Sequence, residues 1–272
     1  MNSITQTHHG TTMSQASMGA YLGSTKQSTR EIPLMYPDPQ PQQKLYVLKK
    51  IPLSSAKLKI QLAAIREAQI MSQLSHPNII QFHTSFVEHD CLYILMEFAE
   101  KGDLYKVIKE QRNKKKYISE KDLWDYAYQI LKGAAYLHSH SVMHRDIKCL
   151  NIFLSDTKTI KLGDLGVSEI VPSGVTQQGT RIGTPLYLAP ELVKNQQYDH
   201  KIDIWAVGCA LYHLACLETP FQGDNLINLG NQIVNKKPKP LPPVYSVKFR
   251  MFVESLLSKA PRDRPTAEEA LQ

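Results

Sequence analysis

The sequence predicts an α+β chain with two lobes, a small lobe built on a β-sheet and a large helical lobe. Between residues 44 and 98, short apolar runs of strand length are separated by turn residues. After Gly102, apolar residues recur at helical spacing instead. No internal repeat is visible, so a solenoid or other repeat architecture is not expected.

The composition narrows the class of protein. Hydrophobic residues make up 42% of the chain and charged residues 21%, as in an ordinary soluble globular protein. No apolar run approaches the roughly 18 to 20 residues of a membrane helix, and Met1–Gly10 lacks the pattern of a signal peptide. The four cysteines are scattered, which argues against a zinc site or a disulfide framework. The net charge of +7 fits either a polyanion partner or a solvated basic surface.

Residues 1–43 differ from the rest of the chain. They are rich in Ser, Thr, Gln and Pro and show no sustained periodicity, so we expect a disordered or atypical segment. Order is expected to begin at Lys44 and to continue through residues 44–272 as one domain.

Three strands and one helix are expected in the first lobe. Residues 45–51 read as a strand, and Ser54 or Ser55 can cap a helix that runs to about Leu74. The apolar runs 79–86 and 91–98, separated by V-E-H-D, are predicted to form an antiparallel pair.

One carboxylate lies on the apolar side of that helix. Glu67 falls among residues whose helical spacing predicts a buried face. Such a group either has a buried partner or lies at the edge of the face and reaches water. The helical pattern alone leaves both interpretations open.

The second lobe is predicted to be mainly helical. A helix with one apolar stripe is expected from Leu123, Ala127, Ile130, Leu131, Ala134 and Leu137. A short hairpin of residues 152–154 and 160–162 should follow, and further helices are expected near 203–216 and 248–258.

The strongest chemical signal is the run M-H-R-D-I-K-C-L-N-I-F-L, residues 143–154. It is followed by D-L-G, which begins at Asp164, and by A-P-E at residues 189–191. This order of motifs resembles the signature of protein kinases, with Leu165 replacing the usual Phe of D-F-G. Lys148, two residues after Asp146, is typical of Ser/Thr kinases. Together with K-L-G-D-L-G and G-T-P-x-Y-x-A-P-E, the motifs most resemble the NIMA-related kinases.

This resemblance implies a protein-kinase-like two-lobed fold and the transfer of phosphate from ATP to serine or threonine hydroxyls of protein substrates. The N-lobe would cover residues 44–96, the hinge residues 97–99 and the C-lobe residues 100–272. The first two strands of the N-lobe would be missing. The catalytic residues it implies are Asp146, Lys148, Asn151, Lys49 and Glu67. Lys49 and Glu67 should form an ion pair, which gives the carboxylate on the apolar side its partner.

The resemblance also assigns the sites of ATP and Mg²⁺. The residues expected to bind the nucleotide and its metal are Val47, Lys49, Met96, Glu97, Ala99, Phe153 and Asp164. Asn151 and Asp164 would be the Mg²⁺ ligands, because carboxylate and amide oxygens suit this hard cation. Structural roles are implied for others: Asp203 would anchor the catalytic loop, Arg264 would pair with Glu191, and a column linking the lobes would consist of Met71, Phe82, His144 and Leu165.

A glycine-rich phosphate loop does not appear where the resemblance requires it. Residues 27–43 contain no glycine, and other residues cannot bring backbone amides around a phosphate in the same way. Weak binding of Mg·ATP and slow turnover are therefore expected. Two hypotheses remain: an active kinase whose N-terminus is represented incorrectly, or a kinase-like scaffold with weak or no catalysis.

Regulation and partners follow from the same resemblance. Thr180 lies between D-L-G and A-P-E, where an activating kinase could phosphorylate it and Arg145 could engage the phosphate. Thr184 should help to select a Ser or Thr hydroxyl. Nucleic acid is not expected as a partner, because the basic run 113–116 is predicted to lie in a loop between helices and lacks interleaved aromatic residues. A membrane is not expected either, because no apolar run is long enough to span one. The family resemblance implies a cytoplasmic protein associated with the cytoskeleton or a cilium.

Overall fold

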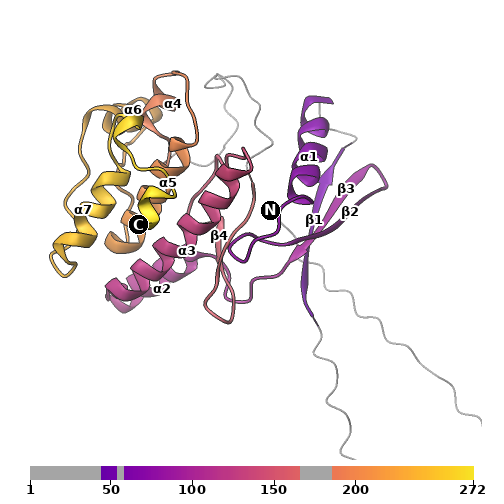
Figure 1. Cartoon of the computed structure of the whole chain (residues 1–272), viewed down its shortest axis with the longest axis horizontal. Coiled ribbons are helices and arrows are strands. Elements are labelled where there is room, and N and C mark those ends of the chain that lie inside the picture. Colours follow the sequence, from indigo (N-terminus) through magenta and orange to yellow (C-terminus); the bar gives the residue numbers. More distant parts are fainter. Residues whose placement is uncertain (1–43, 54–57, 166–185) are drawn as a thin grey trace, which may run out of the picture. The chain divides into compact units, whose positions relative to one another are not determined.

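The computed structural model describes residues 44–53, 58–165 and 186–272 (Figure 1). The helices and strands of these residues lie in one compact unit, Tyr46–Gln272. A small antiparallel sheet with one helix precedes a larger helical part, so the predicted two-lobed α+β fold is confirmed. The division into N-lobe, hinge and C-lobe at the residues given above stays a prediction. The two further strands that kinases place before this sheet would fall in residues 1–43, outside the described residues.

The sheet contains three described strands in the order β1-β3-β2. Their bounds are Tyr46–Pro52 for β1, Phe82–Glu88 for β2 and Cys91–Glu97 for β3. Both neighbouring pairs are antiparallel, as the sequence predicted. Lys49 of β1 lies opposite Ile94, and Val47 lies opposite Met96. Because side chains alternate along a strand, Val47 and Lys49 share one face of the sheet.

The turn between β2 and β3 is shorter than predicted. The sequence suggested the four residues V-E-H-D, but Val87 and Glu88 continue the ladder opposite Leu92 and Cys91. Only two residues make the turn, with φ of 44° at His89 and 54° at Asp90. Two consecutive left-handed residues are characteristic of the tight turn that matches strand twist. The predicted four-residue separation was therefore wrong.

Helix α1, Leu58–Met71, follows β1. Its predicted cap at Ser54 or Ser55 lies outside the described residues. The expectation that it reaches Leu74 was wrong, because the next turn is tighter than an α-helix. There Gln73 N donates to Ile70 O and Leu74 N to Met71 O, the i→i+3 pattern common at helix ends.

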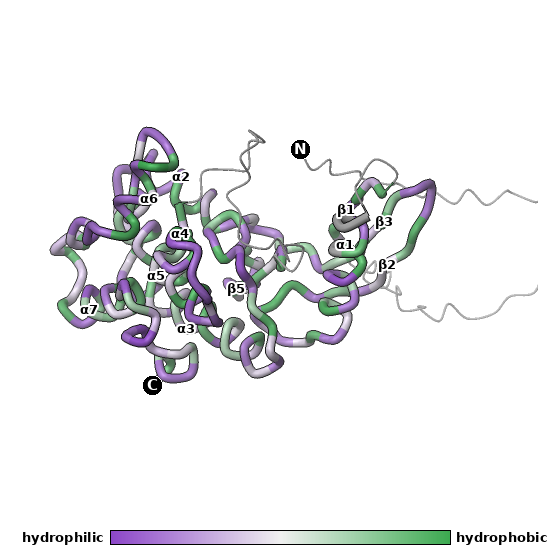
Figure 2. The backbone as a smooth tube through the Cα atoms, turned by 90° about the horizontal axis from the view of Figure 1, so that it is seen from above, coloured by the Kyte–Doolittle hydropathy of each residue, from purple (hydrophilic) through white to green (hydrophobic). Residues whose placement is uncertain are grey.

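The helical part surrounds one fully buried helix. Every residue of α5 from Ile202 to Ala215 is buried, including the indole of Trp205. The surrounding elements are α2 Leu104–Lys114, α3 Glu120–Ser139, β4 Ile152–Leu154, β5 Ile160–Leu162, α4 Pro190–Val193, α6 Leu226–Asn235, α7 Val247–Leu256 and the 3-10 turns Pro261–Asp263 and Glu269–Leu271. In Figure 2, hydrophilic and hydrophobic stretches alternate along these outer helices, as amphipathic packing requires.

Helix α3 carries the predicted stripe. All six of its expected core positions are buried, and the Ser119 hydroxyl caps it by accepting from Asp122 N. The predicted hairpin is also confirmed, as β4 and β5.

The basic run 113–116 was expected in a loop, which is wrong for its first half. Asn113 and Lys114 lie in the last turn of α2, and Lys115, with φ of 52°, caps the end of this helix. Within the described residues, no helix is long and apolar enough to cross a membrane.

Candidate active site

The segment between α3 and β4 holds an oriented carboxylate. Lys148 Nζ lies 2.6 Å from Asp146 Oδ2, and Asn151 Nδ2 donates to the same oxygen at 2.7 Å and to the backbone oxygen of Asp146 at 2.9 Å. The Asp146 side chain is 46% exposed. The sequence therefore folds this loop so that an accessible carboxylate is fixed by two donors from its own loop.

A second charged cluster joins three segments distant in the sequence. Lys49 Nζ on β1 lies 3.1 Å from Glu67 Oε1 on α1 and 3.1 Å from Asp164 Oδ1, just beyond β5. The ion pair of Lys49 and Glu67 that the resemblance implied is thus present. The alternative, a Glu67 side chain at the edge of the apolar face reaching water, is wrong, because that side chain is only 5% exposed.

Burial and pairing act against each other in this cluster. Burial raises the pKa of Glu67, and the Lys49 charge only partly offsets that effect. Burial lowers the pKa of Lys49, but Glu67 and Asp164 outweigh it, so the pKa of Lys49 is raised overall. The ammonium is therefore held in its charged form, ready to meet an anionic ligand.

The oriented loop is anchored to the core through α5. Asp203 Oδ2 accepts from His144 N, and Asp203 Oδ1 accepts from Arg145 N, both at 2.8 Å. Burial would raise the pKa of Asp203, yet the His138 hydrogen bond and these donors hold it below its usual value. Arg145 and Asp164 both adopt left-handed backbone, with φ of 65° and 52°. Such residues persist only where the surroundings fix them, which supports a functional loop.

A second buried anchor joins the end of the chain to α4. Arg264 binds Glu191 through two parallel bonds, Nη1 to Oε1 at 2.7 Å and Nη2 to Oε2 at 2.8 Å. The same guanidinium donates to three backbone oxygens, at Ser258, Lys201 and Lys259. The expected pairing of Arg264 with Glu191 is therefore confirmed.

The residues expected around adenine fall into two groups. Val47 and Met96 lie side by side on the face of the sheet that carries Lys49, with Val47 38% exposed and Met96 buried. Phe153 packs so close to Gly163 that a Cβ there would lie 2.8 Å from the Phe153 ring. A larger residue at 163 would therefore force the side chains of Phe153 and Ile80 to shift.

Two residues predicted to lie in the hinge, Glu97 and Ala99, differ in which of their polar groups already have a hydrogen-bond partner. The Glu97 carboxylate is occupied, because it pairs with Lys161 Nζ at 2.8 Å and accepts from Gln81 N. The Glu97 N–H is also used, because it donates to Gln81 O at 2.9 Å, so neither this N–H nor the side chain is available to a ligand. Ala99 is buried, and no described group accepts a hydrogen bond from its N–H, which suits a ligand acceptor at that point.

The remaining oxygens suit a hard cation such as Mg²⁺. Asn151 uses its amide N–H toward Asp146, so its amide oxygen faces no described donor. Asp164 gives Lys49 one carboxylate oxygen and is 42% exposed. The described residues contain no cluster of three His, Cys, Asp or Glu side chains placed to hold a metal. Mg²⁺ normally takes one or two protein oxygens together with phosphate and water, so this donor set fits it.

Most of the residues expected to form the column between the lobes are buried. Met71, His144 and Leu165 are buried and Phe82 is half-buried. Burial lowers the pKa of His144, which stays neutral despite the aspartates nearby.

Two positioning residues were not singled out from the sequence. His138 Nε2 lies 2.9 Å from Asp203 Oδ2 and so supports the loop anchor. Asn78 is buried and donates from Nδ2 to Ile160 O at 2.9 Å, which ties the segment before β2 to β5. His138 has no local motif, whereas the H-P-N sequence before β2 offered a signal for Asn78. Thr180, Thr184 and residues 27–43 lie outside the described residues.

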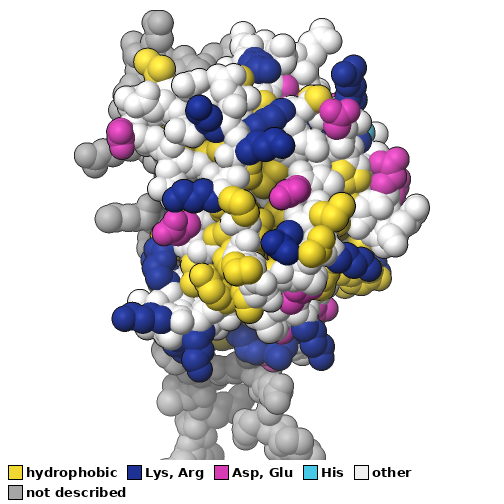
Figure 3. All heavy atoms as spheres, turned by 90° about the vertical axis from the view of Figure 1, so that its left-hand side faces the viewer, with side chains coloured by type: hydrophobic (Ala, Val, Ile, Leu, Met, Phe, Trp, Pro, Cys, Tyr) yellow, Lys and Arg dark blue, Asp and Glu magenta, His cyan; other side chains and the backbone are white. Residues whose placement is uncertain are grey.

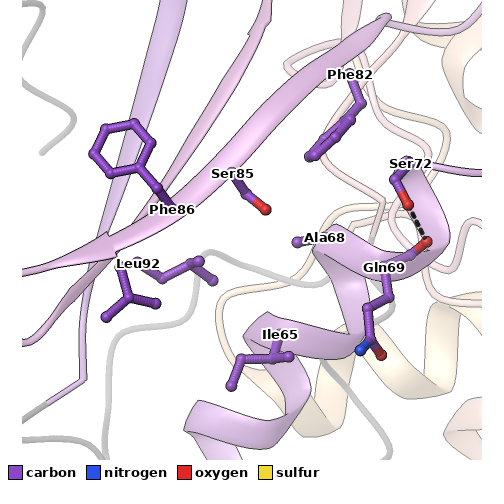
Figure 4. Close-up of a pocket in the computed structure, with 9 residues that line it drawn as sticks. Ile65, Ala68, Gln69, Ser72, Phe82, Ser85, Phe86 and Leu92 are labelled. Carbon is purple, nitrogen blue, oxygen red and sulfur yellow. Dashed lines mark hydrogen bonds between the residues drawn. The ribbon is translucent and has the colours of Figure 1, made fainter.

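A groove of about 440 Å³ lies between α1 and β2 (Figure 4). Ile65, Ala68 and Gln69 face it from α1, while Ser85 points toward the helix from β2. No titratable side chain lines it. It therefore cannot supply acid–base chemistry, and the charged clusters remain the candidate active site.

Comparison with known proteins adds independent findings. The family model described as a protein kinase domain matches residues 39–272. The chain is 39% identical to serine/threonine-protein kinase Nek4 of Mus musculus over 84% of its length, and 37% identical to Nek11 of Homo sapiens over 85%. It spans only 29% of that Nek4 and 36% of that Nek11. A crystal structure of Rad53 1-466 in complex with AMP-PNP is similar, with a TM-score of 0.69, 28% identity, and coverage of 84% of this chain and 57% of the other.

Proposed function

Because the chain belongs to the protein kinase family, with Nek serine/threonine kinases among its relatives, we propose that it transfers phosphate from ATP to serine or threonine hydroxyls of protein substrates. The observation that carries this proposal is the pair of charged clusters. One presents an oriented carboxylate, and the other holds a lysine between two carboxylates. Phosphoryl transfer needs positioning and charge neutralisation more than covalent chemistry, and these clusters provide both.

Asp146 is assigned to the acceptor hydroxyl. Its carboxylate is exposed enough for a substrate to reach and is fixed by Lys148 and Asn151. It would orient the hydroxyl and accept its proton as the new bond to phosphorus forms. Lys148, which contacts Asp146 directly, would balance charge on the transferred phosphate.

Lys49 is assigned to the α- and β-phosphates of ATP. Glu67 fixes the direction of its ammonium group. Val47 and Phe153 would lie on either side of adenine, with Met96 as the gatekeeper at the back. The backbone of Glu97 and Ala99 would bind the adenine edge.

Asn151 and Asp164 are assigned to Mg²⁺. The cation would neutralise the charge that builds up on the phosphates during transfer. Asn151 thus has two tasks, because its amide N–H orients Asp146 while its amide oxygen remains for the metal.

Two further assignments extend the proposal to regulation and location. Phosphorylation of Thr180 by an activating kinase would raise activity, and Thr180→Ala would lower it; an unmodified Thr180 in the mass spectrum of active protein would refute this.

The family resemblance supports a cytoplasmic protein associated with the cytoskeleton or a cilium. Microscopy of the tagged chain tests this, and exclusion from both structures would contradict it.

The test of the proposed reaction is phosphorylation of a generic Ser/Thr protein substrate by the parent and Asp146→Asn. Loss of the base should lower turnover by about 10² to 10⁴-fold, while Mg·ATP affinity stays nearly unchanged. Asp156→Asn is the matched control, because Asp156 is exposed in the turn between β4 and β5. Equal and measurable turnover in the parent and Asp146→Asn would refute the assignment, whereas no turnover in either protein would favour the kinase-like scaffold.

A further inference from the structure

The solvent face of α7 is apolar. Val247 and Met251, one helical turn apart, are 60% and 63% exposed. Val244, just before the helix cap Ser246, is 64% exposed, and Tyr117 in the α2–α3 connection is 53% exposed. The Tyr117 ring lies 6.2 Å from that of Tyr245, which brings the two segments together. We call Tyr117, Val244, Val247 and Met251 the α7 patch.

Helix geometry places cations on both sides of this patch. Phe249, Val253 and Leu256 turn inward and are buried. With about 100° of rotation per residue, Lys248 and Arg250 then flank the line from Val247 to Met251. Arg250 is half-buried, and its Nε has no hydrogen-bond partner among the described residues.

More cations come from the neighbouring α2–α3 connection. Together with Lys248 and Arg250 of α7, the lysines from the end of α2 to the start of α3 make six cations in the segments that form the patch, namely Lys114, Lys115, Lys116, Lys121, Lys248 and Arg250. Among the described residues, none of them lies within 4.0 Å of a carboxylate. Figure 3 shows hydrophobic side chains gathered on the lower half of this face, with Lys and Arg side chains around them.

Three nearby carboxylates, Glu120, Asp122 and Glu254, offset this charge only in part, because they face six cations. Glu120 accepts from both the backbone and the hydroxyl of Ser246, and from Trp124. Asp122 accepts from Ser119 Oγ. Glu254 lies one turn beyond Met251, at the far end of the patch. The surface thus combines exposed apolar area with an excess of unpaired cations, a combination that attracts partners of opposite charge.

We propose that the α7 patch docks a short acidic segment of a partner protein that also carries apolar side chains. Leu or Phe side chains of the segment would cover Val247 and Met251, while its carboxylates would meet the lysines. A discrete segment fits better than an anionic membrane, because a flat lipid surface would bring negative charge against Asp122 and Glu254. The proposal does not depend on the catalytic assignment, since none of the α7 patch residues belongs to the charged clusters around Asp146 and Lys49.

Fluorescence anisotropy with a labelled peptide of three Glu-Phe-Asp-Leu repeats tests this. At near-physiological salt, the intact chain should bind it, and Lys115→Glu/Lys116→Glu should weaken binding about tenfold by reversing two rim charges. Met251→Ser should weaken it about fivefold as an apolar anchor is lost. Both variants should keep the parent's kinase activity on a generic substrate.

Matched controls separate docking from general charge attraction. Lys158→Glu/Lys194→Glu makes the same change in net charge at exposed sites elsewhere, and Ile227→Ser removes an 84% exposed apolar residue from α6. Both should bind the peptide like the parent, and a peptide with Ser for Phe and Leu should bind more weakly. The proposal is overturned if the parent does not bind, if the controls weaken binding equally, or if patch variants change binding only to phosphatidylserine vesicles.

Discussion

The two lobes hold their parts of the site in different ways. In the helical lobe the anchoring charges are buried, with Arg264 1%, Glu191 3% and Asp203 1% exposed, and each has several hydrogen-bond partners. In the sheet lobe, Lys49 is 27% exposed on an edge strand among the described residues. The helical lobe therefore joins the catalytic loop to its core, whereas the sheet lobe positions Lys49 mainly through ion pairs. Loss of the first kind of contact should destabilise the fold, and loss of the second should lower activity with little change in stability.

The largest expected effect is on the buried anchor. Arg264→Leu leaves Glu191 buried without its partner, which should cost about 3 to 5 kcal/mol of unfolding free energy. Thermal unfolding should show a fall in Tm on the order of 10 °C for a domain of this size. Arg262→Leu is the matched control, because Arg262 is 89% exposed. An unchanged Tm for Arg264→Leu would mean that the helical lobe does not depend on its buried charges.

A smaller effect is expected from the sheet lobe. Glu67→Gln removes the charge that directs Lys49 toward the phosphates. Misplacing a positioning group in this way can lower turnover by about 10²-fold. Steady-state phosphorylation measures it, with Glu88→Gln as control, because the Glu88 side chain is 60% exposed. Full activity in Glu67→Gln would show that Asp164 alone positions Lys49.

The smallest expected effect is on pH dependence. Burial raises the pKa of Glu67. Protonation of Glu67 should therefore lower kcat/KM for ATP as the pH falls, and this loss should begin at a pH higher than the ordinary glutamate pKa of about 4.3. This acid limb should be absent from Glu67→Gln. The folded parent also binds this proton more tightly than the unfolded chain does, so its stability relative to Glu67→Gln should decrease as pH rises through the same range. Identical profiles for the two proteins would contradict the role of Glu67.

The sequence revealed the features that depend on local spacing. The H-R-D-x-K-x-x-N motif located Asp146 and Asn151, and the α3 stripe located a core face, because each is written within a few turns of chain. The Lys49–Glu67 pair came from joining a carboxylate on an apolar face to a family resemblance.

Features that depend on tertiary contacts could not be predicted in this way. His138 acts through Asp203, 65 residues away, and no local pattern indicates such a pair. The end of α1 and the two-residue turn at His89 and Asp90 were also missed, because a sequence pattern locates the ends of helices and strands only to within a few residues. The predictions for Thr180 and for a phosphate loop concern residues that the structure does not describe.

The difference between the lobes is tested most directly by the unfolding free energy of Glu67→Gln, measured in urea on the preparation whose turnover is assayed. Lys49 keeps its contact with Asp164 and is partly exposed. A neutral Gln also removes the cost of burying the Glu67 charge, so the change should be about 1 kcal/mol or less, although turnover has fallen. A loss as large as that of Arg264→Leu would contradict the account, because it would show that the Lys49 cluster is as essential to folding as the buried anchor.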